Sequence, residues 1–300
     1  MAADKKVVEE LLHKNASLAE LDLKGADLSS LDFHKANLEG VVLANADLVK
    51  ADLSDANLRG ADLSGARLEG ANLLRASLSG ARLWFADLSF CNLSEADLTN
   101  ADLHDCKLGG ARVWRTKLAR SRFLSRKNFS LKKGILRKER IDERSSRAAE
   151  DGYRALKNHF LLHGKYDDAS WASYREKVME MRQLLEKRSP ALIPSFFMNV
   201  LCGYGEVPHR VVIVAAGLIF LFAELFAKLH TVIDSTSKAA ITSFSDCLYF
   251  SVVTFTTLGY GDILPAPFPL ARLLAGCEAF LGIFTMGLFV FTLGRRYSAR

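Results

Sequence analysis

Residues 51–70 read ADLSDANLRGADLSGARLEG, which is four units of five residues with an apolar residue first and third in each. The same division holds without slippage over residues 16–125 and gives 22 units. Alanine is first in 15 units and leucine is third in 19, the exceptions being Phe33, Val113 and Phe123. Because residues two apart point to the same side of an extended chain, these two positions face one interior.

A continuous helix does not fit this period, since steps of five at 3.6 residues per turn carry the leucines around the whole cylinder. Four units with a corner in each close a square coil of about 20 residues, and coils stacked roughly 4.8 Å apart enclose an Ala/Leu interior. Residues 16–125 thus resemble the pentapeptide-repeat family, which implies a right-handed quadrilateral β-helix. Helical spacing within residues 1–15, at Val7, Leu11 and Leu12, predicts an N-terminal cap helix for this rod.

The surface charge of the repeats argues against a nucleic-acid function. Outward acidic residues alternate with lysines and arginines, and the net charge of residues 16–125 is only −2, so DNA mimicry by an acidic rod is not expected. We expect instead a cytosolic protein partner of the repeat surface. The cysteines show neither C-x-x-C pairing nor metal-ligand spacing and are interpreted as small reduced thiols: Cys91, Cys106, Cys202, Cys247 and Cys277.

Residues 126–190 lack the five-residue period and carry a net charge of +7. They are interpreted as a cytosolic helical hairpin, with Gly164 between its helices. Its apolar faces are expected to be Ala149, Tyr153, Leu156 and Phe160 on the first helix, and Trp171, Tyr174, Val178 and Met181 on the second. His159 and His163 share a helix face as half of a metal site would, but Asp167 lies beyond the expected helix end, so both are interpreted as solvated surface residues.

Two later stretches have the length and apolar character of membrane spans. Residues 209–230 form the expected outer helix and residues 267–294 the expected inner helix, and about 20 apolar residues suffice to cross a bilayer. Residues 191–208 are expected to lie on the membrane surface, and their GYG triplet at 203–205 precedes the first span. Basic flanks at 126–190 and at Arg295, Arg296 and Arg300 place both termini in the cytoplasm, at a bacterial-type inner (plasma) membrane.

Between the spans, residues 243–255 are apolar but too short to cross, and Thr-Leu-Gly-Tyr-Gly follows at 257–261. This arrangement resembles the pore loop of potassium channels over residues 207–297. The resemblance implies a re-entrant pore helix and a selectivity filter in which backbone carbonyls replace the hydration shell of K⁺. Since one chain supplies a quarter of each oxygen ring, a homotetramer in the lipid bilayer is required.

The resemblance also assigns roles to single residues. The K⁺ ligands are the carbonyls of Thr257, Leu258, Gly259 and Tyr260, with the Thr257 hydroxyl, while Gly259 and Gly261 permit unusual backbone angles. Leucine at 258 departs from the usual valine, but its carbonyl is what coordinates. The filter is expected to be supported by Thr256, Asp262, Tyr249 and Phe250.

Gating residues are less constrained by the sequence. Gly282 aligns with a proposed hinge glycine and Gly287 with a second small residue, although close helix packing explains Gly282 equally well. Phe289 and Phe291 are candidates for an apolar constriction. Glu224 and Glu278 are intramembrane carboxylates, which are costly and hence functional candidates unless each is neutral or hydrogen-bonded, with Lys228 a partner for Glu224.

The sequence therefore predicts a multidomain membrane protein: a right-handed quadrilateral β-helix, a cytosolic helical hairpin and a two-span α-helical potassium-channel pore with a re-entrant loop. It predicts no enzymatic activity, no nucleic-acid partner and no cofactor apart from permeant K⁺. The alternative is a membrane-tethered interaction scaffold whose pore is silent.

Overall fold

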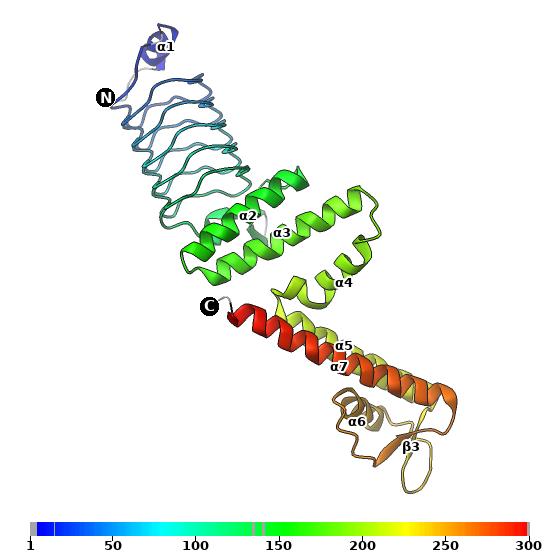
Figure 1. Cartoon of the computed structure of the whole chain (residues 1–300). Helices are drawn as coiled ribbons and strands as arrows, with labels where there is room; N and C mark the ends of the chain where they lie inside the picture. Colours follow the sequence, from blue (N-terminus) through cyan, green and yellow to red (C-terminus); the bar gives the residue numbers. More distant parts are fainter. Residues whose placement is uncertain (1–4, 15, 134–135, 140–141, 299–300) are drawn as a thin grey trace. The chain divides into compact units, whose positions relative to one another are not determined.

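The computed structural model describes residues 5–14, 16–133, 136–139 and 142–298. These form two compact units, residues 1–190 and residues 191–300. The first unit contains the stacked coils and a helical pair, and the second contains the apolar helices (Figure 1). Part of the predicted cap, at residues 1–4 and 15, lies outside the described residues, as does Arg300.

The repeats form the predicted square coils. Isolated parallel bridges join residues that are 20 apart, from Asp22 with Val42 to Asp102 with Arg122, so four five-residue units make each turn. The fifth residue of most units has a positive φ, which turns the chain at each corner. The alanines and leucines between these corners are almost fully buried, with Leu53, Ala71 and Leu73 at 0% exposure. The five-residue period is thus explained by burial of two side chains per corner.

The rod is capped at its N-terminal end by α1, Lys5–His13. The residue that this helix buries is Val8, at 0% exposure, whereas the predicted Val7 is 53% exposed. Leu11 and Leu12 pack against the core as expected. The buried position is therefore shifted by one residue from the predicted one, because a pattern of nine residues is too short to distinguish Val7 from Val8.

At the other end the repeat register slips. Phe123 was predicted to point inward, but it is 56% exposed and has a φ of +63°, while its neighbour Leu124 is fully buried. The short 3₁₀ helix η1, Arg126–Phe129, then closes the core with Phe129. The Asn128 amide nitrogen donates to the carbonyls of Leu103 and Cys106 at 3.3 and 2.8 Å.

The segment that follows is only partly helical, which corrects the prediction for residues 126–190. Strands β1, Ser130–Lys133, and β2, Leu136–Glu139, form an antiparallel hairpin. The helical pair is α2, Ser146–Leu162, and α3, Tyr166–Glu186, with Gly164 at a φ of +67° between them.

The two helices bury different kinds of residues. Helix α2 buries the predicted face, Ala149, Tyr153, Leu156 and Phe160. Helix α3 instead buries two alanines, two polar residues and one methionine: Ala169, Ala172, Ser173, Glu176 and Met179. The predicted Trp171 and Val178 pack only at the edge of the core. Glu176 is buried as the partner of Arg154 and Lys157, at 2.8 and 2.6 Å, and a pattern of apolar residues does not reveal such a buried charge.

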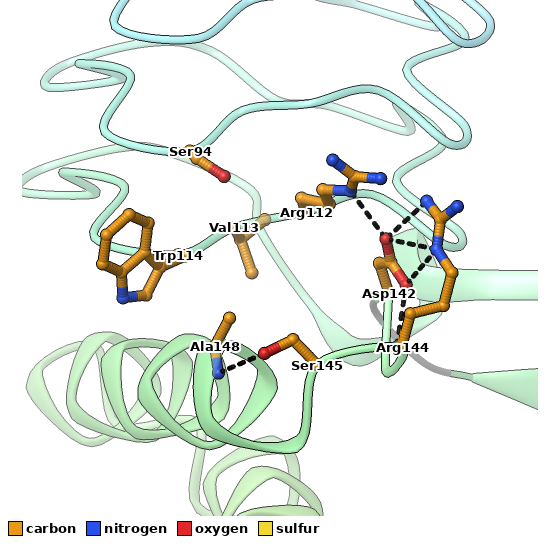
Figure 2. A pocket seen from close by; sticks show the side chains of 8 residues that line it. All are labelled: Ser94, Arg112, Val113, Trp114, Asp142, Arg144, Ser145 and Ala148. Atoms are coloured by element: carbon orange, nitrogen blue, oxygen red, sulfur yellow. Dashed lines mark hydrogen bonds and ion pairs between the residues drawn. The ribbon is translucent and has the colours of Figure 1, made fainter.

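The helical pair is fastened to the last coils of the rod. Asp142 accepts hydrogen bonds from Arg112 and Arg144, both at 2.7 Å (Figure 2). Its backbone N–H donates to the Ala111 carbonyl. Burial would raise the pKa of Asp142, but these arginines and the Arg144 backbone N–H hold the pKa at about 2. Trp114 donates to Asp151 on α2 at 3.3 Å. The rod and the helical pair therefore share one interface.

The second unit begins with α4, Leu192–Cys202, and the 3₁₀ helix η2, Gly203–Gly205. It continues with α5, Pro208–Leu229, then α6, Phe244–Phe255, and α7, Pro269–Ser298. Strands β3, Val232–Asp234, and β4, Ile263–Pro265, pair antiparallel between these helices, which the sequence did not predict. Helices α5 and α7 have the length and apolar composition of membrane spans. In the most apolar 18-residue stretch of each helix, only 22% and 17%, respectively, is buried within the chain.

Candidate functional site

The segment of residues 257–261 begins where α6 ends. The Thr257 N–H donates to the Thr254 carbonyl and the Leu258 N–H to the Val253 carbonyl, both at 3.0 Å. This pair of bonds is a Schellman motif, whose left-handed position is usually glycine. Here Thr257 occupies that position with a φ of +57°. A positive φ is unusual for a β-branched residue, so the backbone at Thr257 is strained.

Positive φ recurs at every second residue of this segment. Thr257, Gly259 and Gly261 have φ values of +57°, +58° and +81°, whereas Leu258 and Tyr260 do not adopt positive φ. Such alternation allows successive carbonyl groups to point to the same side of the chain. The segment therefore has a backbone pattern that suits a column of oxygen ligands. The residue types alone predicted unusual backbone angles at Gly259 and Gly261, but not at Thr257.

The segment is uncovered on the single chain. Residues 256–262 are all exposed, with Leu258 at 58% and Tyr260 at 68%. Two large side chains with this exposure within three residues are unusual for a surface that meets only water.

Two of the predicted supporting residues contact each other at the C-terminal end of this segment. The Tyr249 hydroxyl on α6 hydrogen-bonds the Asp262 carboxyl, and the Asp262 carbonyl accepts from the Ser235 N–H at 2.9 Å. Because β4 follows directly at Ile263, the segment is held between α6 and the β3–β4 pair.

The other two supporting residues face elsewhere. Phe250 is 6% exposed and packs edge-on against Phe226 of α5, with ring centroids 5.1 Å apart, so it joins α6 to α5. The Thr256 hydroxyl donates to the Val252 carbonyl of its own helix at 2.7 Å.

A second set of contacts joins α6 to α7. Glu278 of α7 is fully buried, and its Oε1 is hydrogen-bonded to the Ser251 hydroxyl of α6. The hydroxyl oxygen of Ser251 also lies 2.9 Å from the carbonyl oxygen of Ile219 on α5. One turn further along α7, a Cβ built on Gly282 would overlap the Phe255 carbonyl, so the small residue permits close packing of the helices. Ser251 was missed because a serine in an apolar helix gives no signal of its partner.

The remaining gating candidates take no part in these contacts between α6 and α7, as far as the structure describes the chain. Glu224 pairs with Lys228 at 2.9 Å, as predicted, and both side chains are well exposed on the single chain. Gly287 has no other side chain or backbone within 4 Å of a built Cβ among the residues that the structure describes. Phe291 is 52% exposed and Phe289 is half-buried.

The prediction of two solvated surface histidines holds for His163, which is exposed, but is wrong for His159. His159 is 5% exposed, and its Nδ1 lies 3.0 Å from the Leu118 carbonyl of the rod. The His163 ring lies 4.2 Å from the His159 ring. Burial, and next the neighbouring His163, lower the pKa of His159 to about 4. His159 therefore helps to dock α2 as a neutral residue.

Comparisons with known proteins divide the chain in the same way as the structure does. Residues 209–299 match the family described as ion channel, and residues 14–43, 36–73 and 76–115 match pentapeptide repeats. Two pore potassium channels b and a from Oryza sativa subsp. japonica are 43% and 41% identical over 61 residues. That match covers 20% of this chain, and the chain spans only 17% of the length of these relatives.

Solved structures resemble the first unit. A pentapeptide repeat protein from Nostoc PCC 7120, alr5209, is 31% identical, with 43% of this chain and 94% of that chain covered and a TM-score of 0.30. HetL, a pentapeptide repeat protein from the same cyanobacterium, is 32% identical, with 36% and 59% covered and a TM-score of 0.22. Neither matched family is an enzyme family. The chain therefore joins pentapeptide repeats in its N-terminal half to an ion channel domain, of the two-span potassium-channel type, at residues 209–299.

Proposed function

We propose that the protein is a homotetrameric potassium-selective channel in which residues 257–261 of four chains form the filter. The observation that carries this proposal is the alternating positive φ at Thr257, Gly259 and Gly261, in a segment placed between two apolar helices. The carbonyls of residues 257–260 and the Thr257 hydroxyl are the proposed K⁺ ligands. The strain at Thr257 supports this role, because it persists at a place where glycine would remove it.

The exposure of the segment supports assembly of four chains. A single column of carbonyls surrounds an ion on one side only, whereas four columns complete each oxygen ring. Tetramer formation also accounts for Leu258 and Tyr260, which are more than half exposed on one chain. In the assembled channel their side chains point away from the axis and are covered by neighbouring subunits.

We further propose that α6 is re-entrant and that both termini are cytoplasmic. Helix α6 has 12 residues, which is too short to cross, and irregular backbone at membrane depth requires protein or a water-filled path around it. The +7 charge of residues 126–190 precedes α5 and favours the cytoplasmic side of a bacterial-type inner membrane. The rod, a right-handed β-helix, and the helical hairpin are then cytosolic and serve as a scaffold or gating regulator for a protein partner.

The filter is tested by comparing two glycines in identical triplets. Gly259→Ala and Gly205→Ala both place a methyl group at a positive φ, of +58° and +84°, so each carries a similar backbone penalty of about 1 kcal/mol. Only Gly259 belongs to the proposed filter. The measurement is K⁺ and Na⁺ flux into liposomes that contain the purified full chain, with and without external Ba²⁺.

We expect the parent protein and Gly205→Ala to pass K⁺ in preference to Na⁺, with block by Ba²⁺, and Gly259→Ala to lose this preference. Equal loss in both variants would trace the effect to general instability and would count against the assignment of the filter. An absence of flux in the parent protein under every condition would instead favour a tethered scaffold with a silent pore.

A further inference from the structure

The contacts between α6 and α7 form two matched steps. Ser251 and Phe255 are four apart on α6, and they meet Glu278 and Gly282, which are four apart on α7. Residues four apart lie on the same face of a helix, so these contacts form one continuous seam. We refer to Ser251, Phe255, Glu278 and Gly282 as the seam. Since Phe255 is the last residue of α6, the seam ends two residues before Thr257.

Hydrogen counting at Ser251 determines what Glu278 contributes. The Ser251 hydroxyl has one hydrogen to donate, yet its oxygen lies within hydrogen-bond distance of both the Ile219 carbonyl and Glu278 Oε1. The Ile219 carbonyl can only accept. Two full bonds form together when Ser251 donates to Ile219 and Glu278 carries a proton that it donates to Ser251; with an ionised Glu278, the two acceptors would have to share one hydrogen.

The burial of Glu278 agrees with the protonated form. The side chain is fully buried, and no donor reaches its Oε2 among the described residues of the chain. An ionised carboxylate with one oxygen unpaired in such a place is far more costly than a neutral carboxyl group.

We propose that Glu278 is a positioning residue for the filter: as a neutral hydrogen-bond donor it fastens α7 to Ser251 of α6, and through Ser251 to α5, so that the seam sets the position of Thr257. This inference rests on the proposed channel function. Gly282 completes the seam, because a side chain there would push the Phe255 carbonyl away and displace the start of the filter.

Two variants of Glu278 separate the effect of the hydrogen-bond donor from the effects of charge and of side-chain size. Glutamine keeps a donor for Ser251 and has no charge, whereas Glu278→Leu has similar bulk and no donor. We expect Glu278→Gln to retain the K⁺ over Na⁺ preference of the parent protein, and Glu278→Leu to lose it by about tenfold, as for one buried hydrogen bond. Gly276→Ala is the matched control on α7, since a Cβ there meets nothing within 4 Å.

Hydrogen exchange on the same full-length proteins gives a second readout. In Glu278→Leu and Ser251→Ala, the amides of residues 251–258 should exchange at least about tenfold faster. The double variant should exchange like Ser251→Ala, because Glu278→Leu removes only a bond that Ser251→Ala has already removed. Glu278→Gln should exchange like the parent protein. Equal behaviour of Gln and Leu at position 278, in exchange or in selectivity, would overturn the proposal while leaving the channel function intact.

A parent protein without K⁺ flux would overturn the channel function and with it any role of Glu278 in selectivity. The exchange comparison would then still decide whether the seam holds α6 in place. The failures of the two proposals are therefore distinguishable.

Discussion

At the scale of single residues, Thr257 places two physical requirements in conflict. Its position at the end of α6 favours glycine, since φ is +57° and threonine is β-branched. Its hydroxyl, however, is the side-chain ligand of the proposed filter. In the proposed channel, function rather than folding therefore determines the identity of residue 257.

This conflict predicts opposite effects on stability and conduction. Thr257→Gly should raise the stability of the assembled protein, by up to about 1 kcal/mol per chain from relief of the left-handed strain. The same variant should lower K⁺ flux, because one side-chain oxygen per chain is lost. Thr257→Ser is the control, since it keeps the hydroxyl and should retain flux.

Both quantities can be followed on the same preparation, by thermal unfolding in detergent and by K⁺ flux in liposomes. A Thr257→Gly protein that is less stable than the parent, or that conducts equally well, would argue against the conflict described here.

At the scale of elements, the sequence predicted the coils of the rod but not how the rod is closed at its C-terminal end. The five-residue period requires a corner in every unit, and the bridges between residues 20 apart confirm the four-sided coil. At Phe123 and Leu124 the pattern carries no information about which side chain turns inward, because both are apolar. The choice depends on Phe129 and Asn128, which close the core from the next segment.

Contacts between distant elements were also beyond the reach of sequence. His159 lies on the face of α2 that docks on the rod, and its partner is a backbone carbonyl at Leu118, 41 residues earlier. Similarly, Glu278 was recognised as an intramembrane carboxylate, but its partner Ser251 lies 27 residues away. Periodicity reports which face of an element is buried, but it does not report what covers that face.

The docking of α2 should depend on pH through His159. The pKa of His159 is about 4 in the folded protein and 6.5 for an ordinary, solvated histidine. Between pH 4 and 6.5 the unfolded state therefore binds more protons than the folded state. Stability should therefore fall as the pH drops from about 6.5 to 4, by at most roughly 3 kcal/mol, and level off below that range. His159→Gln should remove this part of the pH dependence.

Tryptophan fluorescence during urea unfolding is a selective readout, because Trp84, Trp114 and Trp171 all lie in the first unit. His163→Gln is the control, because it keeps His159 and should retain most of the pH dependence. If His159→Gln and the parent protein lost stability equally between pH 6.5 and 4, another group would be responsible.

At the scale of the whole molecule, the two units differ in how much of their apolar surface is buried within one chain. The rod buries its alanines and leucines within one chain. The second unit instead leaves large apolar residues exposed along α7, including Leu273, Phe280, Ile283 and Val290, together with Leu258 and Tyr260 beyond α6. Lipid covers part of such a surface, and neighbouring copies of the chain cover the rest in the proposed channel.

The central claim is therefore that four copies surround one axis, and native mass spectrometry of the full chain released from a membrane mimetic tests it most directly. One chain has a mass of 33.2 kDa, so the account predicts a dominant species at four times that mass. A protein that remained at 33.2 kDa under conditions where α5 and α7 stay embedded would contradict it.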